Sequence, residues 1–285
     1  MRFNFFSIML LASFAMVVSC SNGDDMSSDT GKMTILLTDA PFPHDLVAEA
    51  NVTIFKIDAR NKDEETDDSF VVLMEQEIKV NLLELTNGIT ETLVNTDVPV
   101  GTYDLVRVYV KGVNVVLTDG TSYNLDVPSG EQTGIKLFIK PGLTVNGGLS
   151  ADLLLDFDVS RSFVAKGDSK DLAGITGFNF KPVIKASNMS SAGTLYGEVI
   201  TLEEEMAVSL EGAQVSIFTA DTLNTTTFTD ETGAYMVMGL MAGSYDVTVD
   251  IDGYGSQTAE DVEIIAANKT SQDFELIVSE EATGN

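Results

Sequence analysis

The sequence predicts an all-β protein built from two β-sandwich domains, of which the second is the smaller. Short runs of β-branched and apolar residues alternate with polar ones, as they do in half-buried strands. Glycine, asparagine and aspartate separate these runs at the regular spacing that is typical of sandwiches. The first domain contains no amphipathic pattern long enough for an ordinary helix, which favours the all-β class.

Candidate strands of the first domain share two marks, an alternation of apolar and polar residues and a turn residue or proline at the end. They cover residues 33–38, 51–59, 70–74, 104–111, 114–117, 122–127, 135–139, 151–159 and 178–186. Residues 80–88 fit either a strand or one helical turn.

Turns and prolines predict how these strands follow one another. The charged residues 61–68 and the triplet Thr118-Asp119-Gly120 each predict a hairpin, the second because Asp-Gly is a strong hairpin dipeptide. Pro41 and Pro141 each predict the end of a strand, since proline lacks the N–H that a strand ladder needs.

A second domain begins after the small, polar residues 187–193, which predict a linker. We therefore expect domains at 32–187 and 193–279 and a disordered tail at 280–285. The candidate strands of the second domain cover residues 194–200, 213–219, 226–230, 234–238, 243–251 and 272–278.

Composition excludes several function classes. The chain has 44 acidic and 16 basic residues and a formal charge of -28, which argues against binding nucleic acid. It has one cysteine and one histidine, so an intrachain disulfide, a thiolate metal site and a catalytic triad are excluded. We expect no enzymatic activity and no obligatory cofactor.

The N-terminus carries the marks of an export signal. Arg2 precedes an apolar run at residues 3–18, and a small residue, Ser19, precedes Cys20. This order resembles the signal peptide and lipobox of bacterial lipoproteins, in which the cysteine is acylated and becomes the first residue of the mature chain. We expect a signal peptide at 1–19 and attachment to a membrane through Cys20.

Polar residues 20–31 predict a flexible tether behind the lipid. Asp24 and Asp25 within it resemble the acidic signal that sends Bacteroidetes lipoproteins to the outer face of the outer membrane. The resemblance implies a surface-exposed location, and the alternative is an ordinary polar linker.

The first domain carries a series of motifs in a fixed order, namely LTDAP (37–41), NVTIFKI (51–57), LLELTNG (82–88), PVGTYDLVRV (99–108), LLLDFDV (153–159) and FKPVI (180–184). With these motifs it resembles a bacterial lipoprotein family defined as a domain of unknown function, DUF4382. The resemblance covers roughly residues 32 to 186 and implies no activity.

The second domain has its own motifs, namely GEVI (197–200), LEGAQVSI (210–217), TDETGAY (229–235) and LMAGSYDVTV (240–249). With these motifs it resembles the carboxypeptidase regulatory-like, transthyretin-type domain, a fold grouped with carbohydrate-binding modules. This resemblance implies either a structural spacer or a sugar binder.

Three aspartates are the candidate metal ligands. Asp156 and Asp158 fall on one face of the strand 151–159, opposite Leu155 and Phe157, and could converge with Asp39 on a hard cation such as Ca²⁺. The alternative is a solvated acidic face with Asp39 capping the turn before Pro41. A glycosidase pair is disfavoured, because it needs one carboxyl in an apolar pocket.

Exposed aromatic rings are the usual platforms for sugars, and this chain has no tryptophan. Tyr123, Tyr196 and Tyr254 are the candidates, with Tyr254 expected to be the most exposed. The pattern assigns the remaining tyrosines of interest to packing, namely Tyr103, Tyr235 and Tyr245. Asp221-Thr222-Leu223 also fits a short O-glycosylation pattern of exported Bacteroidetes proteins.

These observations together predict a surface lipoprotein that acts as a binding or adhesion module for a glycan or protein ligand. The alternatives are a carbohydrate-binding accessory protein of a polysaccharide-uptake system and a structural spacer of an envelope complex.

Overall fold

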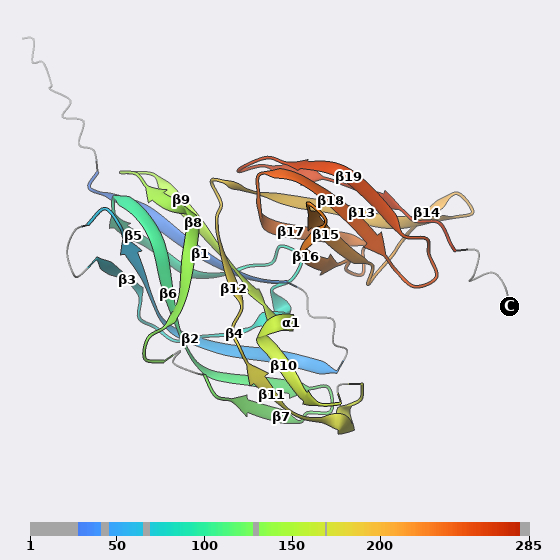
Figure 1. Cartoon of the computed structure of the whole chain (residues 1–285), viewed down its shortest axis with the longest axis horizontal. Helices are drawn as coiled ribbons and strands as arrows, with labels where there is room; N and C mark the ends of the chain where they lie inside the picture. Colours follow the sequence, from blue (N-terminus) through green and yellow to red (C-terminus); the bar gives the residue numbers. More distant parts are fainter. Residues whose placement is uncertain (1–27, 41–45, 65–68, 128–130, 169, 280–285) are drawn as a thin grey trace, which may run out of the picture.

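Two β-domains follow one another along the longest axis of the molecule (Figure 1). The structure, a computed structural model, describes residues 28–40, 46–64, 69–127, 131–168 and 170–279. Across these described ranges, no helix has the length and apolar character needed to cross a bilayer.

The described residues of the first domain form twelve strands and three short helical turns. The strands are β1 (Thr30–Ala40), β2 (Val47–Asn61), β3 (Phe70–Met74), β4 (Ile78–Asn81), β5 (Glu91–Pro99), β6 (Gly101–Leu117), β7 (Ser122–Leu125), β8 (Ile135–Val145), β9 (Ser150–Asp158), β10 (Phe163–Gly167), β11 (Ile175–Phe180) and β12 (Ile184–Asn188). The turns are η1 (Leu82–Glu84), α1 (Val159–Ser162) and η2 (Leu172–Gly174).

These strands form two main sheets. One has the order β12-β9-β1-β5, in which β1 and β9 run parallel. The other has the order β3-β2-β6-β7, with β4 added to β2 and β8 added to β6. A separate ribbon of β10 and β11 continues from α1.

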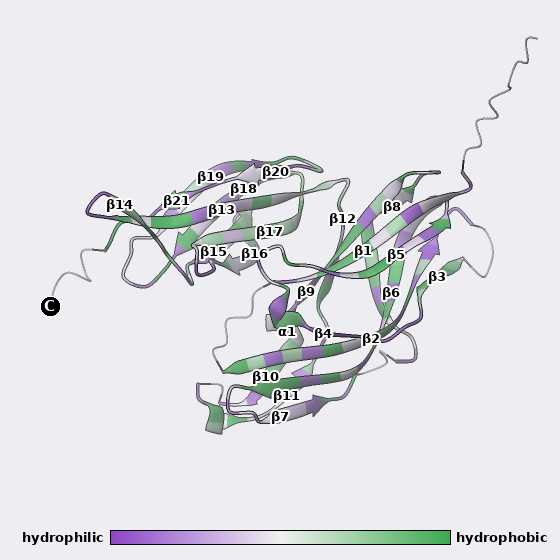
Figure 2. Ribbon diagram, turned by 180° about the vertical axis from the view of Figure 1, so that it is seen from behind, coloured by the Kyte–Doolittle hydropathy of each residue, from purple (hydrophilic) through white to green (hydrophobic). Residues whose placement is uncertain are grey.

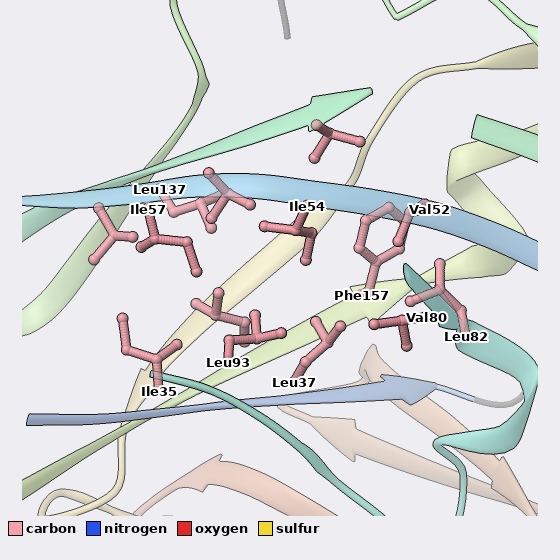
Figure 3. Close-up of a cluster of buried hydrophobic side chains, with 14 of the residues drawn as sticks. Ile35, Leu37, Val52, Ile54, Ile57, Val80, Leu82, Leu93, Leu137 and Phe157 are labelled. Carbon is pink, nitrogen blue, oxygen red and sulfur yellow. The ribbon is translucent and has the colours of Figure 1, made fainter. Parts of the chain in front are cut away.

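The core of the first domain lies between these sheets. Ile35 and Leu37 of β1 and Phe157 of β9 point toward Ile54 and Ile57 of β2 (Figure 3). As predicted for residues 151–159, Leu153, Leu155 and Phe157 face this core; Leu154 is also buried, but outside this core and near Gly239 of the second domain. Apolar burial on this scale is the main stabilising contribution to such a sandwich.

Apolar residues of β2 point into the core on both sides of a break in the register between β2 and β6. Ile54 and Ile57 are an odd number of residues apart, yet both are buried. The register between the two strands shifts between Ile54 and Lys56, and such a bulge reverses the side to which later residues point. The alternation of buried and exposed residues in β2 therefore shifts by one position at the bulge and then resumes.

Two sequence predictions about strand ends are wrong. Residues 104–111 and 114–117 form one strand, β6, rather than two, with Gly112 at φ 57° inside it. β8 continues through Pro141 to Val145, because the proline lies where the register against β6 is interrupted, between Tyr103 and Leu105. Proline is tolerated at such an interruption, since no ladder hydrogen bond is lost there.

The structure also assigns residues 80–88, which the sequence left ambiguous, and residues 178–186 at the end of the first domain. Residues 80–88 contain both the end of β4 and the helical turn η1, capped by Asn81. Residues 178–186 belong to two strands, β11 and β12, in different sheets, rather than to one. The chain then turns at residues 189–191 and enters the second domain.

The second domain is a sandwich of two sheets. One is built on β13, with β14 and β17 as antiparallel neighbours and β20 and β21 paired in parallel; the other has the order β16-β15-β18-β19. The strands are β13 (Ala192–Glu203), β14 (Met206–Ser209), β15 (Gln214–Thr219), β16 (Thr222–Phe228), β17 (Ala234–Met241), β18 (Gly243–Asp250), β19 (Gln257–Ile264), β20 (Lys269–Ser271) and β21 (Phe274–Glu275).

Hydrophobic and hydrophilic residues alternate along most of these strands (Figure 2). The inward set forms a second core, separate from the first, around Leu195, Val215 and Tyr235. β14 and β19 were not among the predicted strands, since β14 is exposed throughout and β19 has only two buried residues, Val262 and Ile264.

Three tyrosines serve packing, as predicted. Tyr103 and Tyr245 are buried, and each donates its hydroxyl to the carbonyl four residues earlier, of Pro99 and Met241. The hydroxyl of Tyr235 donates to the carbonyl of Gln272. A buried hydroxyl needs such a partner, because an unpaired one costs stability.

Candidate functional site

A loop of the first domain contacts the second domain. It follows η1 and turns at Asn87 and Gly88, both with positive φ, at 53° and 79°. The Asn87 side chain accepts a hydrogen bond from the hydroxyl of Thr227 at 3.2 Å and donates one to the carbonyl of Ala234 at 3.4 Å. Gly88 packs so closely on Met236 that an added Cβ would lie 2.3 Å from its sulfur.

A further contact lies at the other side of this interface. Ser187 of β12 donates its hydroxyl to the carbonyl of Gly239 in β17 at 3.0 Å. Gly239 has φ 75°, and a Cβ there would meet Ser187 and Leu154. The two domains are thus joined by specific polar contacts on residues far apart in the sequence.

The loop forms one wall of a groove of about 330 Å³, which we call the Tyr196 groove. Its lining comes from both domains, with one residue from the first and the rest from the second. The lining residues are Asn87, Tyr196, Gly197, Glu198, Asp230, Ala234, Tyr235, Met236, Ser271 and Asp273.

Strand alternation builds the floor of this groove. Tyr196 and Glu198 are two residues apart on β13 and are exposed, whereas the residues between and beside them are buried. Across the ladder, Tyr196 pairs with Met236 of β17 on one side and with Ser271 of β20 on the other. The exposed face of three adjacent strands therefore carries one aromatic ring and a carboxylate.

Two further carboxylates are fixed by backbone hydrogen bonds. Asp273 accepts from the amide of Glu198 at 2.9 Å. Asp230 holds the turn before β17, where it accepts from the amides of Thr232 and Ala234 and from the Thr232 hydroxyl. Partial burial disfavours the charged form of Asp230, but the Thr232 and Ala234 bonds outweigh it and lower its pKa.

The tyrosines predicted as platforms differ in exposure from what was expected. Tyr196 is 38% exposed. Tyr254, expected to be the most exposed, is half-buried, packs on the second core and bridges to Val278. Tyr123 donates its hydroxyl to the carbonyl of Ile175 and packs edge-on against Phe178. Tyr196 is thus the most exposed of the three.

The three aspartates predicted as calcium ligands do not converge. In the parallel ladder Asp39 lies beside Phe157, whereas Asp156 and Asp158 lie beside Thr38 and Ala40, on the opposite face. Asp158 instead caps α1 through the amide of Arg161 and forms an ion pair with its side chain.

No group of three or more histidine, cysteine, aspartate or glutamate side chains within the described part of the chain could hold a metal ion. The prediction that Asp39, Asp156 and Asp158 gather around a cation is therefore wrong. The alternative, a cap by Asp39 on the turn before Pro41, involves residues outside the described part of the chain; within it, the Oδ1 of Asp39 accepts from the amide of Val159.

Asp39 is nevertheless an unusual carboxyl group. It is 4% exposed, and its Oδ2 has no hydrogen-bond partner among the described residues. Burial raises its pKa well above the ordinary value, the hydrogen bond from Val159 lowers it in part, and the charges of Asp156 and Asp158 raise it further. The neutral form is therefore the one that the fold favours.

Asp39→Asn is expected to have a higher free energy of unfolding than the wild type, by an amount that grows as the pH rises above about 4, where an unfolded aspartate ionises. Because the folded-state pKa is raised, the wild type has its full stability below the unfolded pKa and loses it as the pH rises through the folded pKa. At pH 7.5 the advantage of the variant should reach about 1–3 kcal/mol, the usual cost of an unpaired buried group. Urea unfolding at pH 4.5 and 7.5 measures the difference.

Asp152→Asn is the matched control, since Asp152 lies on the same strand and is exposed. Its effect on the free energy of unfolding should be small, because the side chain is exposed. An advantage of Asp39→Asn that stays constant between the two pH values would contradict the raised pKa.

A larger, open cavity of about 780 Å³ lies beside the turn between the domains. Asp152, Asn188 and Asn268 are among its lining residues, and it contains no aromatic ring. It lacks the combination of an aromatic face and several carboxylates that marks the Tyr196 groove.

Family comparisons agree with the two-domain architecture. Residues 30–182 match the model of the domain of unknown function DUF4382. The chain belongs to the DUF4382 family. Residues 194–277 match the model of the carboxypeptidase regulatory-like domain, so both family resemblances predicted from the motifs are confirmed. No curated protein matches this DUF4382 protein.

Solved structures similar to the DUF4382 protein share little sequence with it. A type II cohesin-X-dockerin complex of Acetivibrio cellulolyticus is 18% identical, with a TM-score of 0.25, over 30% of this chain and 58% of that one. The minor pilin GBS52 of Streptococcus agalactiae is 11% identical (TM-score 0.26, 87% and 96% covered). The shaft pilin spaA of Lactobacillus rhamnosus GG is 12% identical (TM-score 0.27, 88% and 98% covered). The chain thus spans less than two thirds of the first of these three.

Several site residues of this DUF4382 protein were not anticipated from its sequence. Glu198, Asp230 and Asp273 join Tyr196 only through the folding of the second domain, and Asn87 joins them only through contact between domains. The one available signal was the Asn87-Gly88 turn pair. Cys20, Asp24 and Asp25, the predicted lipidation and export residues, lie outside the described residues.

Proposed function

We propose that this DUF4382 protein is a non-catalytic lipoprotein, anchored through Cys20 in the outer membrane and exposed at the cell surface, that binds an extracellular ligand. The observation that carries the proposal is the Tyr196 groove, a recess with an aromatic ring and three carboxylates built jointly by both domains. Pockets with a few convergent polar groups are the usual form of binding sites.

The arrangement of the domains supports display of this groove. β1 begins at one end of the molecule, and the second domain projects away from that end (Figure 1). A chain held at its N-terminus by a lipid and a polar tether would present the second domain away from the membrane. Adhesion or capture of a ligand requires this orientation.

Binding also accounts for features that a spacer does not need. A spacer requires only that its two domains hold one another, which the bonds of Asn87 and Ser187 achieve. An exposed tyrosine beside carboxylates adds nothing to that role. Tyr196 likewise favours, as a second candidate, the carbohydrate-binding accessory protein, because flat rings stack on sugars.

A non-catalytic role suits the state of the carboxylates. General acid and base catalysis by carboxylates needs a pair with different pKa values facing a common substrate. The carboxyl with a strongly raised pKa, Asp39, lies on the opposite face of its sheet from Asp156 and Asp158. Asp158 is further engaged by Arg161.

Protease treatment and antibody labelling of intact cells test the location. We expect the wild type to be accessible, Asp24→Ala with Asp25→Ala to be retained inside while still membrane-bound, and Cys20→Ala to be released from the membrane fraction. Asp29, beyond the proposed signal, supplies the control Asp29→Ala, which should leave exposure unchanged. Protection of the wild type in intact cells, with cleavage only after lysis, would contradict surface display.

A further inference from the structure

The Tyr196 groove is strongly anionic. Glu198, Asp230 and Asp273 line it, and its lining contains no lysine, arginine or histidine. The hydrogen bonds that lower the pKa of Asp230 keep that group charged at neutral pH. Like charges gathered in a recess repel one another, and a bound cation would relieve this repulsion.

The positions of these charges are set by the backbone. Asp273 accepts from the amide of Glu198, and Asp230 accepts from the amides of Thr232 and Ala234. Each bond uses one oxygen, Oδ1 in both aspartates. Carboxylates held in this way are prepared to accept hydrogen bonds from a ligand without losing much side-chain entropy.

The aromatic ring of Tyr196 lies on the same exposed side of β13 as Glu198. Tyr196 precedes Glu198 by two residues on the exposed side of β13, and Ser271 and Met236 flank it on the adjacent strands. A tyrosine ring attracts a cation placed over its face, and more strongly the further the pair is removed from water.

The polar groups of the groove discriminate between a cation and a neutral sugar. Its carboxylates only accept hydrogen bonds, and Asn87 already uses its Oδ1 on Thr227 and one N–H on Ala234. A neutral sugar presents acceptors as well as donors and would cover three carboxylates without neutralising them, which costs free energy. A guanidinium or ammonium group presents donors alone.

We propose that the Tyr196 groove binds a basic side chain, arginine or lysine, presented by a protein partner. This inference rests on the proposed function and names the ligand class of that site. The volume of about 330 Å³ is at the lower end for a ligand pocket, which suits one long side chain and its adjacent backbone. An arginine can pair with a carboxylate in bidentate fashion and stack on the ring of Tyr196.

The test titrates the purified full-length protein with the blocked tripeptide Gly-Arg-Gly, followed by NMR at the amides of Tyr196 and Ser271. We expect saturable binding with a Kd on the order of 1 mM, as for a single side chain. The matched neutral probe, Gly-citrulline-Gly, should bind at least tenfold more weakly. Binding should also weaken as salt is added, because the groups are exposed.

Variants separate this groove from the general acidity of the chain. Glu198→Gln with Asp273→Asn removes two charges while keeping an oxygen to accept the Glu198 amide, and should weaken binding at least fivefold. Tyr196→Ala should also weaken it. Glu260→Gln with Glu263→Gln removes two exposed charges from β19, in the other sheet, and should leave binding unchanged.

Three results would overturn the proposal: equal binding of the arginine and citrulline probes, equal loss in the groove and control pairs, or shifts at Tyr196 with a neutral oligosaccharide but not with the arginine probe. The last would assign the groove to glycans. Because the titration uses purified protein, its failure is distinct from a failure of surface display, which the experiment on intact cells reports.

Discussion

Phe157→Ala is expected to lower the free energy of unfolding of the first domain by about 3–5 kcal/mol. Phe157 is 1% exposed and lies between the two main sheets (Figure 3). Its ring stacks on Phe180 at a centroid distance of 6.3 Å and an interplanar angle of 19°, and it also contacts Phe163. Truncation removes buried apolar area and leaves a cavity that the surrounding strands cannot fill completely.

Urea denaturation followed by circular dichroism measures this loss. Each domain has its own core, so the second domain should unfold at a midpoint much closer to that of the wild type. Phe138→Ala is the matched control, since Phe138 is 60% exposed on β8 and its removal should cost about 0.5 kcal/mol or less. Equal losses for the two variants would show that Phe157 is not in the core.

Strand positions could be predicted from the sequence wherever one face is buried. In β9, the pattern correctly assigned Leu153, Leu155 and Phe157 to the core face, but it did not anticipate that Leu154 between them is buried near Gly239 of the second domain. The same reasoning wrongly divided β6 into two strands and ended β8 too early, because both outcomes depend on how a partner strand is aligned. Pro141 is tolerated only because the ladder with β6 is interrupted beside it.

The candidate site was less accessible to prediction, because it depends on distances that the sequence does not contain. Asp39 and Asp156 suggested a cation site, but the parallel register of β1 with β9 places them on opposite faces. Asn87 and Thr227 are 140 residues apart in the chain and meet only through contact between domains. Tyr196 was a candidate, yet nothing local distinguished its exposure from that of Tyr254.

The joint construction of the groove has a consequence for the family. The DUF4382 domain supplies Asn87, and the carboxypeptidase regulatory-like domain supplies the other lining residues. A carboxypeptidase regulatory-like domain without this neighbour would lack the wall formed by Asn87, whatever its own sequence. A recess of this shape is therefore a property of the pair of domains.

Arg107→Ala is expected to destabilise the first domain by about 3–5 kcal/mol, because it leaves the buried charge of Asp58 without its main partner. The Asp58 side chain is 3% exposed, and both its oxygens accept from the guanidinium of Arg107 at 2.6 Å. The hydroxyl of Tyr109 adds one bond at 3.1 Å. The guanidinium also lies 3.6 Å from the ring centre of Phe70, so its loss removes a cation-π contact as well.

The pair formed by Arg60 and Asp104 supplies the matched control for Arg107→Ala. It has the same two-bond geometry, at 2.9 and 2.8 Å, but its side chains are 35% and 30% exposed. Water can replace the lost guanidinium there, so Arg60→Ala should cost only about 0–1 kcal/mol in urea denaturation. In the double variant Asp58→Leu with Arg107→Met, part of the stability lost in Arg107→Ala should return, because no unpaired charge remains buried. If the double variant is less stable than Arg107→Ala, the attraction between Asp58 and Arg107 contributes more to the free energy of unfolding than the cost of removing the Asp58 charge from water.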